Sequence, residues 1–206
     1  MKPPLRVLIT GGHLTPAIAT IQELQRQHAE ITFVGRTTTD QHQSQSKEQQ
    51  TVQNLSIPFY SITAPKLYRQ PKYLNFLLFP NLIKSIIQAY RIISKVRPNV
   101  ILSFGGYLAI PVAIAAKTAN IPIVTHEQTT VMGVANRFIS SFANKTLISW
   151  KKTSFAPEKA IVTGLPIRSE FYSKSPRPAW LPTLKNLPLI YVTGGNQGSQ
   201  AINLTI

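Results

Sequence analysis

Two short apolar stretches, each followed by glycine or polar residues, constrain the fold of this chain more than any other feature. The run at 100–104, Val-Ile-Leu-Ser-Phe, is rich in apolar side chains and ends at Gly105-Gly106-Tyr107. A helical pattern follows from 109 to 119, and a second apolar run, 121–125, ends at His126-Glu127-Gln128. Strands that alternate with helices predict a parallel sheet, and ligands of such sheets bind beyond the carboxyl ends of the strands. Both polar segments are therefore expected to face one crevice.

Gly105 and Gly106 suit a turn that approaches a ligand closely. Without a Cβ, the backbone can adopt positive φ and bring N–H groups against a ligand at the start of the next helix, whose dipole favours anions. A phosphate is the expected ligand. A tight strand-to-helix turn without a ligand explains an isolated glycine pair equally well. The three successive hydrogen-bonding side chains at 126–128 favour a binding site, although one of them could be a buried structural group.

The N-terminal region repeats the arrangement of strand, glycine turn and helix. Residues 5–9 predict a strand, Thr10-Gly11-Gly12-His13 a turn, and Pro16 the first turn of a helix with an apolar face. Because Gly-Gly-His is not the G-x-G-x-x-G fingerprint, NAD binding is disfavoured. Further strands are expected at 31–35, 57–62, 145–149 and 160–163, further helices from Pro80 onward and at 132–142, and a solvated loop with a polar helix at 36–53.

Acidic residues are scarce, with seven Asp and Glu against 22 Lys and Arg, which gives a net charge of +15. This charge indicates a polyanionic partner, which could be a nucleic acid, an anionic membrane or a phosphorylated ligand. Nucleic acid is disfavoured, because the main basic cluster is interleaved with aliphatic residues and no nucleic-acid-binding motif occurs. With a single Asp, the Asp-x-Asp motif that holds a divalent metal cannot occur, so no metal is expected. No cofactor is expected either.

An apolar segment with a basic collar lies at 71–97. Tyr73-Leu-Asn-Phe-Leu-Leu-Phe79 precedes an amphipathic helical pattern, and lysines and arginines flank both. This combination is typical of a peripheral protein on an anionic membrane, although the aromatic residues could instead belong to the core. No window reaches the roughly 20 apolar residues of a membrane span. The expected membrane contacts are Lys72, Tyr73, Phe76, Leu77, Phe79 and Lys84.

Composition also divides the chain. Residues 1–168 are expected to form one Rossmann-like α/β domain, and the proline-interrupted, charged stretch 169–186 a linker. Residues 187–193 then predict a strand, followed by a glycine-rich loop and a helix from Ser199. One strand and one helix cannot bury their own apolar faces, so residues 187–206 are interpreted as the start of an incomplete second domain.

Six motifs in consistent order connect the chain to a known family. They resemble the MurG family of glycosyltransferases, glycosyltransferase family 28, and together they cover nearly the whole chain. The motifs are Thr10-Gly-Gly-His-Leu-Thr-Pro16, Ser103-Phe-Gly-Gly-Tyr107, Ile121-Pro-Ile-Val-Thr-His-Glu-Gln128, Gly133-Val-Ala-Asn-Arg137, Gly164-Leu-Pro-Ile-Arg168 and Gly194-Gly-Asn-Gln-Gly198.

The resemblance implies a fold, a reaction and a location. The fold would be the N-terminal Rossmann-like domain of a GT-B glycosyltransferase, with flanking helices on a parallel sheet, plus the first βα unit of the donor-binding domain. The reaction would be inverting, metal-independent transfer of N-acetylglucosamine from UDP-N-acetylglucosamine to lipid I, an undecaprenyl-diphosphate-linked acceptor, to form lipid II for peptidoglycan. The location would be peripheral, at the cytoplasmic face of the plasma membrane.

Inverting transfer needs one general base, and two residues are candidates. His13 is the first, because histidine ordinarily titrates near neutral pH and this one lies at a strand-to-helix turn; Glu127 is the second. The resemblance places His13 at the position of the family's proposed base. The expected substrate-binding residues are Thr10, Gly11, Gly12, Gly105, Gly106, Tyr107, His126, Gln128, Thr129, Asn136, Arg168, Gly194, Gly195, Asn196, Gln197 and Gly198.

The chain departs from the family pattern at three places. Thr129 replaces the Asn of His-Glu-Gln-Asn, which removes an amide expected near the sugar; Asn196 replaces a Ser; and the glycine loop before His13 is shorter. The Thr129 departure leaves room for a different lipid-linked sugar substrate. Because the second domain is incomplete, an alternative function is a noncatalytic, membrane-anchoring, acceptor-binding subunit. Its donor-binding domain would be a separate partner chain, as in two-chain eukaryotic relatives.

Overall fold

The computed structural model describes residues 3–36, 38–39, 42–63, 79–173, 190–194 and 200–205. The chain divides into two units, Met1–Tyr172 and Ser173–Ile206. In the second unit, the described residues contain one helix, α7 (Gln200–Thr205). All other elements belong to the first unit.

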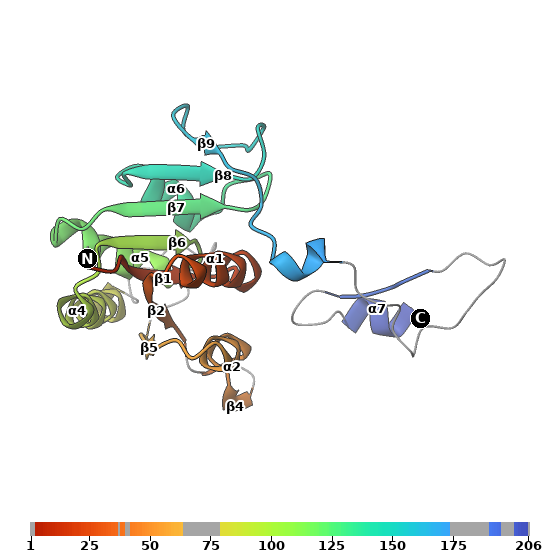
Figure 1. Ribbon diagram of the computed structural model, residues 1–206, viewed down its shortest axis with the longest axis horizontal. Helices are drawn as coiled ribbons and strands as arrows, with labels where there is room; N and C mark the ends of the chain where they lie inside the picture. Colours follow the sequence, from red (N-terminus) through yellow and green to blue (C-terminus); the bar gives the residue numbers. More distant parts are fainter. Residues whose placement is uncertain are drawn as a thin grey trace. The chain divides into compact units, whose positions relative to one another are not determined.

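One parallel sheet forms the centre of the first unit (Figure 1). Among the described residues it has seven strands in the order β5-β2-β1-β6-β7-β8-β9, and every neighbouring pair is parallel. The strands are β1 (Arg6–Gly11), β2 (Glu30–Gly35), β5 (Phe59–Ser61), β6 (Val100–Phe104), β7 (Ile123–Glu127), β8 (Lys145–Ile148) and β9 (Ile161–Val162). This order places β1 between β2 and β6, so at the sheet's carboxyl edge the turn after β1 lies between the segments that follow β2 and β6.

Helices cover both faces of the sheet, and alternate strand residues face each layer. Leu8 of β1 packs with α4 (Phe79–Val96), α5 (Ala109–Thr118) and α6 (Val134–Ser140). Its neighbours Val7 and Ile9 pack on the other side with α1 (Leu14–Arg26) and α2 (Lys47–Asn54). The continuous apolar run of β1 is thus explained by a parallel strand that is buried on both faces.

Two regions differ from the pattern expected from the sequence. Pairing of His126 with Leu147 and of Glu127 with Ile148 extends β7 by two residues, so these side chains lie within the strand and not after it. The 36–53 region contains a small hairpin, β3 (Thr38–Thr39) with β4 (His42–Gln45), before α2. The polar helix expected there is present as α2, and the Ser46 side chain caps its start by accepting a hydrogen bond from the Gln49 amide.

The predicted linker and second domain fall only partly within the described residues. A short 3-10 helix, η1 (Ser169–Tyr172), ends the first unit. Ile190–Gly194 is the described part of the predicted 187–193 strand and its turn, and no strand is assigned to it. Helix α7 begins one residue after Ser199. The limits 1–168, 169–186 and 187–206 stay predictions.

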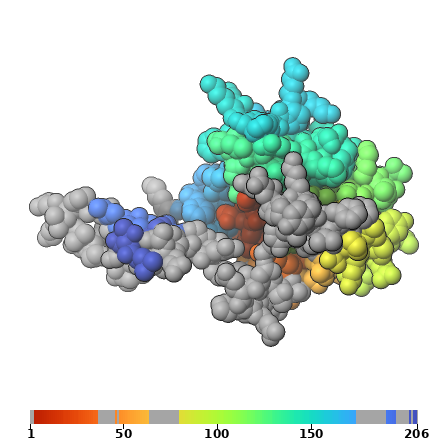
Figure 2. Space-filling model, turned by 180° about the vertical axis from the view of Figure 1, so that it is seen from behind, coloured from red at the N-terminus to blue at the C-terminus, as the bar shows by residue number. Residues whose placement is uncertain are grey.

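Helix α4 presents an apolar surface stripe. Ile83, Ile87 and Tyr90 follow one another at helical spacing and are 45%, 47% and 51% exposed, while Ala89 and Ile93 are buried in the core. Figure 2 shows α4, in yellow, at the surface of the molecule. None of the helices in the described ranges is long and apolar enough to span a membrane.

Candidate active site

The turns that follow β1 and β6 touch each other backbone to backbone. The amide of Gly12 donates to the carbonyl of Gly105 over 2.9 Å, and a Cβ on Gly106 would lie 2.8 Å from the Cα of Gly12. Gly105 and Gly106 adopt φ of 75° and 79°, which side chains disfavour. The two predicted glycine turns therefore form one compact structure at the carboxyl edge of the sheet.

His13 lies immediately before α1 and reaches toward β7. It occupies the N-cap position with extended backbone angles, but its side chain makes no capping hydrogen bond. Its Nδ1 instead lies 2.7 Å from the amide nitrogen of Gln128. The fold thus joins two predicted site residues that are 115 positions apart.

Glu127 is held inside a closed hydrogen-bond network. Its Oε1 accepts from the amide and lies 2.7 Å from the hydroxyl of Thr129, and its Oε2 accepts from the Gly133 amide and from Asn136 Nδ2. Burial raises the pKa of the carboxyl, but these hydrogen bonds outweigh burial, and the net effect lowers the pKa of Glu127. With 2% of its surface exposed, this carboxylate is built to stay ionised and to organise the 127–136 loop.

Asn136 and Thr129, two predicted binding residues, also point into this network. Asn136 is buried, accepts from Thr125 Oγ1 and donates to the carbonyl of His126. The Thr129 hydroxyl lies between Glu127 Oε1 and the carbonyl of Val131, at 2.7 and 2.8 Å. Thr129 therefore turns its polar group toward the protein, which gives its departure from the family a local structural role.

His126 is likewise buried, at 3% exposure. Its Nε2 lies 3.2 Å from the Gly164 carbonyl and 3.3 Å from Ser149 Oγ, and its ring packs against Phe104. Burial lowers the pKa of His126, against the smaller raising effects of the Gly164 hydrogen bond and the Glu127 charge. The imidazole is therefore neutral at pH 7 and connects β7 to the Gly164–Arg168 segment.

Other predicted binding residues differ in accessibility. Thr10 has no exposed surface, and a Cβ on Gly11 would lie 2.7 Å from Cβ of Phe104, so both are enclosed. Gly12 is exposed. Arg168 is half-buried with its guanidinium 5.3 Å from the Phe171 ring centre.

Several predicted residues lie outside what the structure describes. Gly194 is exposed, but Gly195, Asn196, Gln197 and Gly198 lie outside the described residues. The same holds for the membrane candidates Lys72, Tyr73, Phe76 and Leu77 and for the side chain of Phe79, whereas Lys84 is exposed on α4.

Two residues at this edge were not predicted from the sequence. Arg36 follows β2 directly, and its Nη1 lies 3.3 Å from the hydroxyl of Tyr107, across the end of β1. Trp150 follows β8, and its indole N–H donates to the carbonyl of Gln128 over 2.9 Å. Their position just beyond strand ends was the available signal, because polar groups there reach the carboxyl edge. The described residues contain no group of three or more His, Cys, Asp and Glu side chains able to hold a metal ion.

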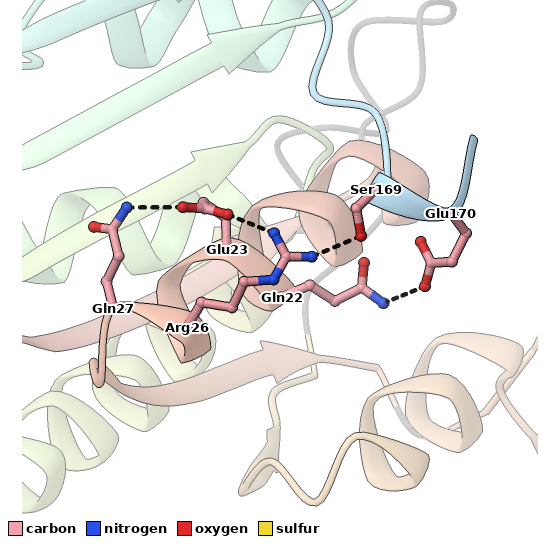
Figure 3. Close-up of polar contacts among 6 residues, drawn as sticks. All are labelled: Gln22, Glu23, Arg26, Gln27, Ser169 and Glu170. Atoms are coloured by element: carbon pink, nitrogen blue, oxygen red, sulfur yellow. Dashed lines mark hydrogen bonds and ion pairs between the residues drawn. The ribbon is translucent and has the colours of Figure 1, made fainter. Parts of the chain in front are cut away.

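Helix α1 also binds the end of the first unit. Figure 3 shows Gln22 Nε2 donating to Glu170 Oε1 and Arg26 Nη2 donating to Ser169 Oγ, at 3.1 and 2.6 Å. Arg26 forms an ion pair with Glu23 at 2.7 Å in addition. The helix that begins at His13 thereby anchors η1.

The chain forms a Rossmann-like domain of the GT-B glycosyltransferase class. Its features are a parallel sheet with helices on both faces, glycine turns at the carboxyl edge of that sheet, and a histidine before α1. A solved calicheamicin glycosyltransferase superposes with a TM-score of 0.60 at 11% identity, covering 91% of this chain and 57% of that one, which shows the fold alone. The crystal structure of Acinetobacter baumannii MurG gives a TM-score of 0.63 at 25% identity, covering 78% of this chain and 45% of that one.

Residues 9–148 match the glycosyltransferase family 28 N-terminal domain, and the chain belongs to this family. It is 36% identical to a Coxiella burnetii protein named UDP-N-acetylglucosamine–N-acetylmuramyl-(pentapeptide) pyrophosphoryl-undecaprenol N-acetylglucosamine transferase, over 96% of this chain and 54% of the relative. A Lachnoclostridium phytofermentans protein of the same name is 33% identical, over 96% of this chain and 56% of its own length. The chain thus spans about half the length of these relatives, and the predicted resemblance to MurG and the predicted fold class are confirmed.

Proposed function

We propose that this chain provides the acceptor-binding half of an inverting glycosyltransferase. The reaction would be transfer of N-acetylglucosamine from UDP-N-acetylglucosamine to undecaprenyl-diphosphate-linked N-acetylmuramyl-pentapeptide, lipid I, which gives lipid II. The observation that carries the proposal is the position of His13, which is half-buried beside the paired glycine turns, with its ring held by Gln128. The names of the curated relatives support the choice of substrates.

His13 is a better general base than Glu127 in this arrangement. A base must have a free lone pair at the proton it removes. Both Glu127 oxygens already accept hydrogen bonds, and the lowered pKa makes that carboxylate a weaker base. The ring of His13 makes its hydrogen bond through Nδ1, and no described residue bonds Nε2.

The glycine turns supply the second part of the proposal. Helix α5 begins directly after the turn at 105–108, so its first N–H groups and its dipole favour an anion there. The guanidinium of Arg36, next to Tyr107, adds a positive charge near this turn. These groups suit the diphosphate of the acceptor, which would place the acceptor hydroxyl toward His13.

The transfer assay tests the function. We would measure incorporation of labelled N-acetylglucosamine into a lipid I analogue by a chimaera in which this chain continues into the C-terminal half of the Coxiella burnetii relative. His13→Asn should reduce kcat by about 10²- to 10⁴-fold, the usual contribution of a general base. The control is His28→Asn: His28 is an exposed histidine after α1 with φ of 59°, a conformation that Asn tolerates.

The outcomes separate the parts of the proposal. An active chimaera that keeps its activity in His13→Asn would place the base elsewhere. An inactive chimaera, alongside an active Coxiella enzyme, would contradict lipid I as acceptor. Transfer that is restored when the two halves are mixed as separate chains would instead favour the two-subunit alternative.

Peripheral membrane binding is the remaining part of the proposal. The exposed stripe Ile83, Ile87 and Tyr90 on α4 is flanked by exposed Lys84 and Arg91, which suits an anionic leaflet. Lys84→Glu should weaken co-sedimentation with phosphatidylglycerol vesicles more than Lys159→Glu, a matched change at an exposed lysine before β9. Equal binding by both variants would show that α4 does not meet the membrane.

A further inference from the structure

Gln128 is fixed on both sides, so its side chain reaches His13 from a rigid base. Its carbonyl accepts from the Trp150 indole over 2.9 Å, and the preceding residue, Glu127, is held by the hydrogen bonds of the 127–136 loop. The side-chain amide then lies 2.7 Å from His13 Nδ1. His13 in turn is fixed at the start of α1.

A neutral imidazole carries its proton on one nitrogen only, and the partner of Nδ1 decides which one. If the amide nitrogen of Gln128 donates to Nδ1, the proton must be on Nε2, and the ring then has no free lone pair. If the amide is turned by 180°, its Oε1 accepts from Nδ1–H, and the lone pair of Nε2 is free. The heavy-atom positions are almost the same in both arrangements.

We propose that Gln128 is a positioning residue that presents its amide oxygen to His13 and so holds the ring in the Nδ1–H tautomer, with Nε2 free to act as base. This inference rests on the proposed function for its consequence in catalysis. It adds a role for Gln128 that differs from direct substrate binding, because the side chain acts through His13.

The tautomer matters at the transfer step. The acceptor O–H bond breaks, its proton passes to Nε2 of His13, and the oxygen forms a bond to the anomeric carbon of the donor sugar. The bond from that carbon to the diphosphate breaks, and UDP leaves with the electron pair. The resulting imidazolium has protons on both nitrogens, and Gln128 Oε1 stabilises it by continuing to accept from Nδ1–H.

Two titratable residues of β7, His126 and Glu127, directly precede Gln128 in the sequence. His126 lies close enough to His13 for the two imidazoles to interact electrostatically. His126 is neutral at pH 7 and above, and Glu127 is ionised there, so neither group changes its charge between pH 7 and the pH of the experiment below. A change in the behaviour of His13 on substitution of Gln128 can therefore be assigned to Gln128.

Nitrogen-15 NMR of the 206-residue chain tests the tautomer without any substrate. At about pH 8.5, where a histidine in water is neutral, His13 should show the Nδ1–H form. Gln128→Glu, whose carboxylate can only accept, should keep that form, and Gln128→Leu should move the population toward Nε2–H. The signals of the other histidines report whether each variant is folded. An Nε2–H tautomer in the wild type, or one that does not respond to Gln128→Leu, overturns the proposal.

Kinetics of the chimaera test the consequence. Gln128→Leu should lower kcat about tenfold or more with a change of less than about twofold in the acceptor KM, and Gln128→Glu should lose less of kcat. A raised KM with unchanged kcat would mean that Gln128 binds substrate directly, which overturns the positioning role. An inactive wild-type chimaera contradicts the proposed function, whereas the NMR result stands independently of it.

Discussion

Asn136 Nδ2 lies 2.9 Å from Oε2 of Glu127, and the same amide donates to the backbone carbonyl of His126. Asn136 is on α6 and Glu127 ends β7, so this contact ties a helix to the carboxyl edge of the sheet. A Cβ on Gly105 would lie 2.8 Å from the same nitrogen. The close approach of the glycine turn to Asn136 thus explains why no side chain fits at position 105.

Asn136→Ala should destabilise the domain strongly. It removes the closer of two hydrogen-bond partners of Thr125 Oγ1 and one of the donors to a buried carboxylate, and groups left unpaired in the interior cost about 1–3 kcal/mol each. We expect the free energy of unfolding in urea to fall by about 2–4 kcal/mol. Asn54→Ala, at an exposed asparagine that ends α2, should change it by less than about 0.5 kcal/mol. Equal effects of the two changes would contradict the structural role of Asn136.

Comparison of Gly106 with Gly164 separates the cost of an unfavourable backbone angle from the cost of a steric clash. Both adopt positive φ, 79° and 81°, but a Cβ at Gly106 would meet Gly12 at 2.8 Å, while nothing lies within 4 Å of one at Gly164. Gly164→Ala should lose about 1 kcal/mol of stability from the backbone angle alone. Gly106→Ala should lose about 3 kcal/mol or more, because the two turns must also separate. Urea unfolding of both variants would measure the difference, and a similar loss in both would show that the turns yield easily.

Apolar runs, glycine turns and helix signals were enough to predict the parallel sheet and its flanking helices. Burial of β1 on both faces appears in the sequence as a continuous run, and Pro16 correctly indicated the first turn of α1. The predicted end of β7, at residue 125, was wrong because the last two residues of the strand are polar. Those residues pair with β8, and the hydrogen bonds of their side chains offset the cost of burying polar groups.

The common location of His13 and the 126–128 segment could be predicted, but the directions of their side chains could not. Sequence spacing placed His13 and the 126–128 segment at one sheet edge, yet it gave no sign that His126 and Glu127 point into the protein while Gln128 reaches His13. Side chains alternate between the two faces of a sheet only while the strand continues. The directions of residues 126–128 therefore could not be predicted without knowing that β7 ends at Glu127. The contact between Arg36 and Tyr107 was missed because it depends on β1 lying between β2 and β6. The order of strands in a sheet cannot be predicted from the residues of each strand alone.

The contacts of α1 with η1 should protect the segment 169–172 from proteolysis. Arg26→Ala removes the hydrogen bond to Ser169 (Figure 3) and should leave global stability within about 0.5 kcal/mol, because the pair is exposed. Local opening should increase, so chymotrypsin should cleave after the exposed Phe171 and Tyr172 about threefold faster. Lys117→Ala, at an exposed lysine in the last turn of α5, is the control and should not change the rate. An unchanged rate in Arg26→Ala would mean that other contacts hold η1.

The raised pKa of the Glu48 carboxyl should make the folded protein less stable as the pH rises. Glu48 lies on α2 beside Gly35, and burial raises the pKa of its carboxyl from 4.5 to about 7, against the smaller lowering effects of the Arg36 amide and charge. The folded state therefore binds this proton more tightly than the unfolded state. The free energy of unfolding should be unaffected by Glu48 below about pH 4.5 and should fall by at most about 3 kcal/mol as the pH rises through about 7.

Comparison with Glu48→Gln isolates this effect. Glutamine keeps an acceptor for the Arg36 amide and carries no charge, so the variant should become more stable relative to the wild type between pH 5 and pH 8. The difference between the two proteins is the informative quantity, because His126, with its lowered pKa, changes stability in the opposite direction as the pH rises through about 6.5. Urea unfolding of both proteins at several pH values would measure it. A difference that stays constant with pH would show that Glu48 ionises in the folded protein as it does in water.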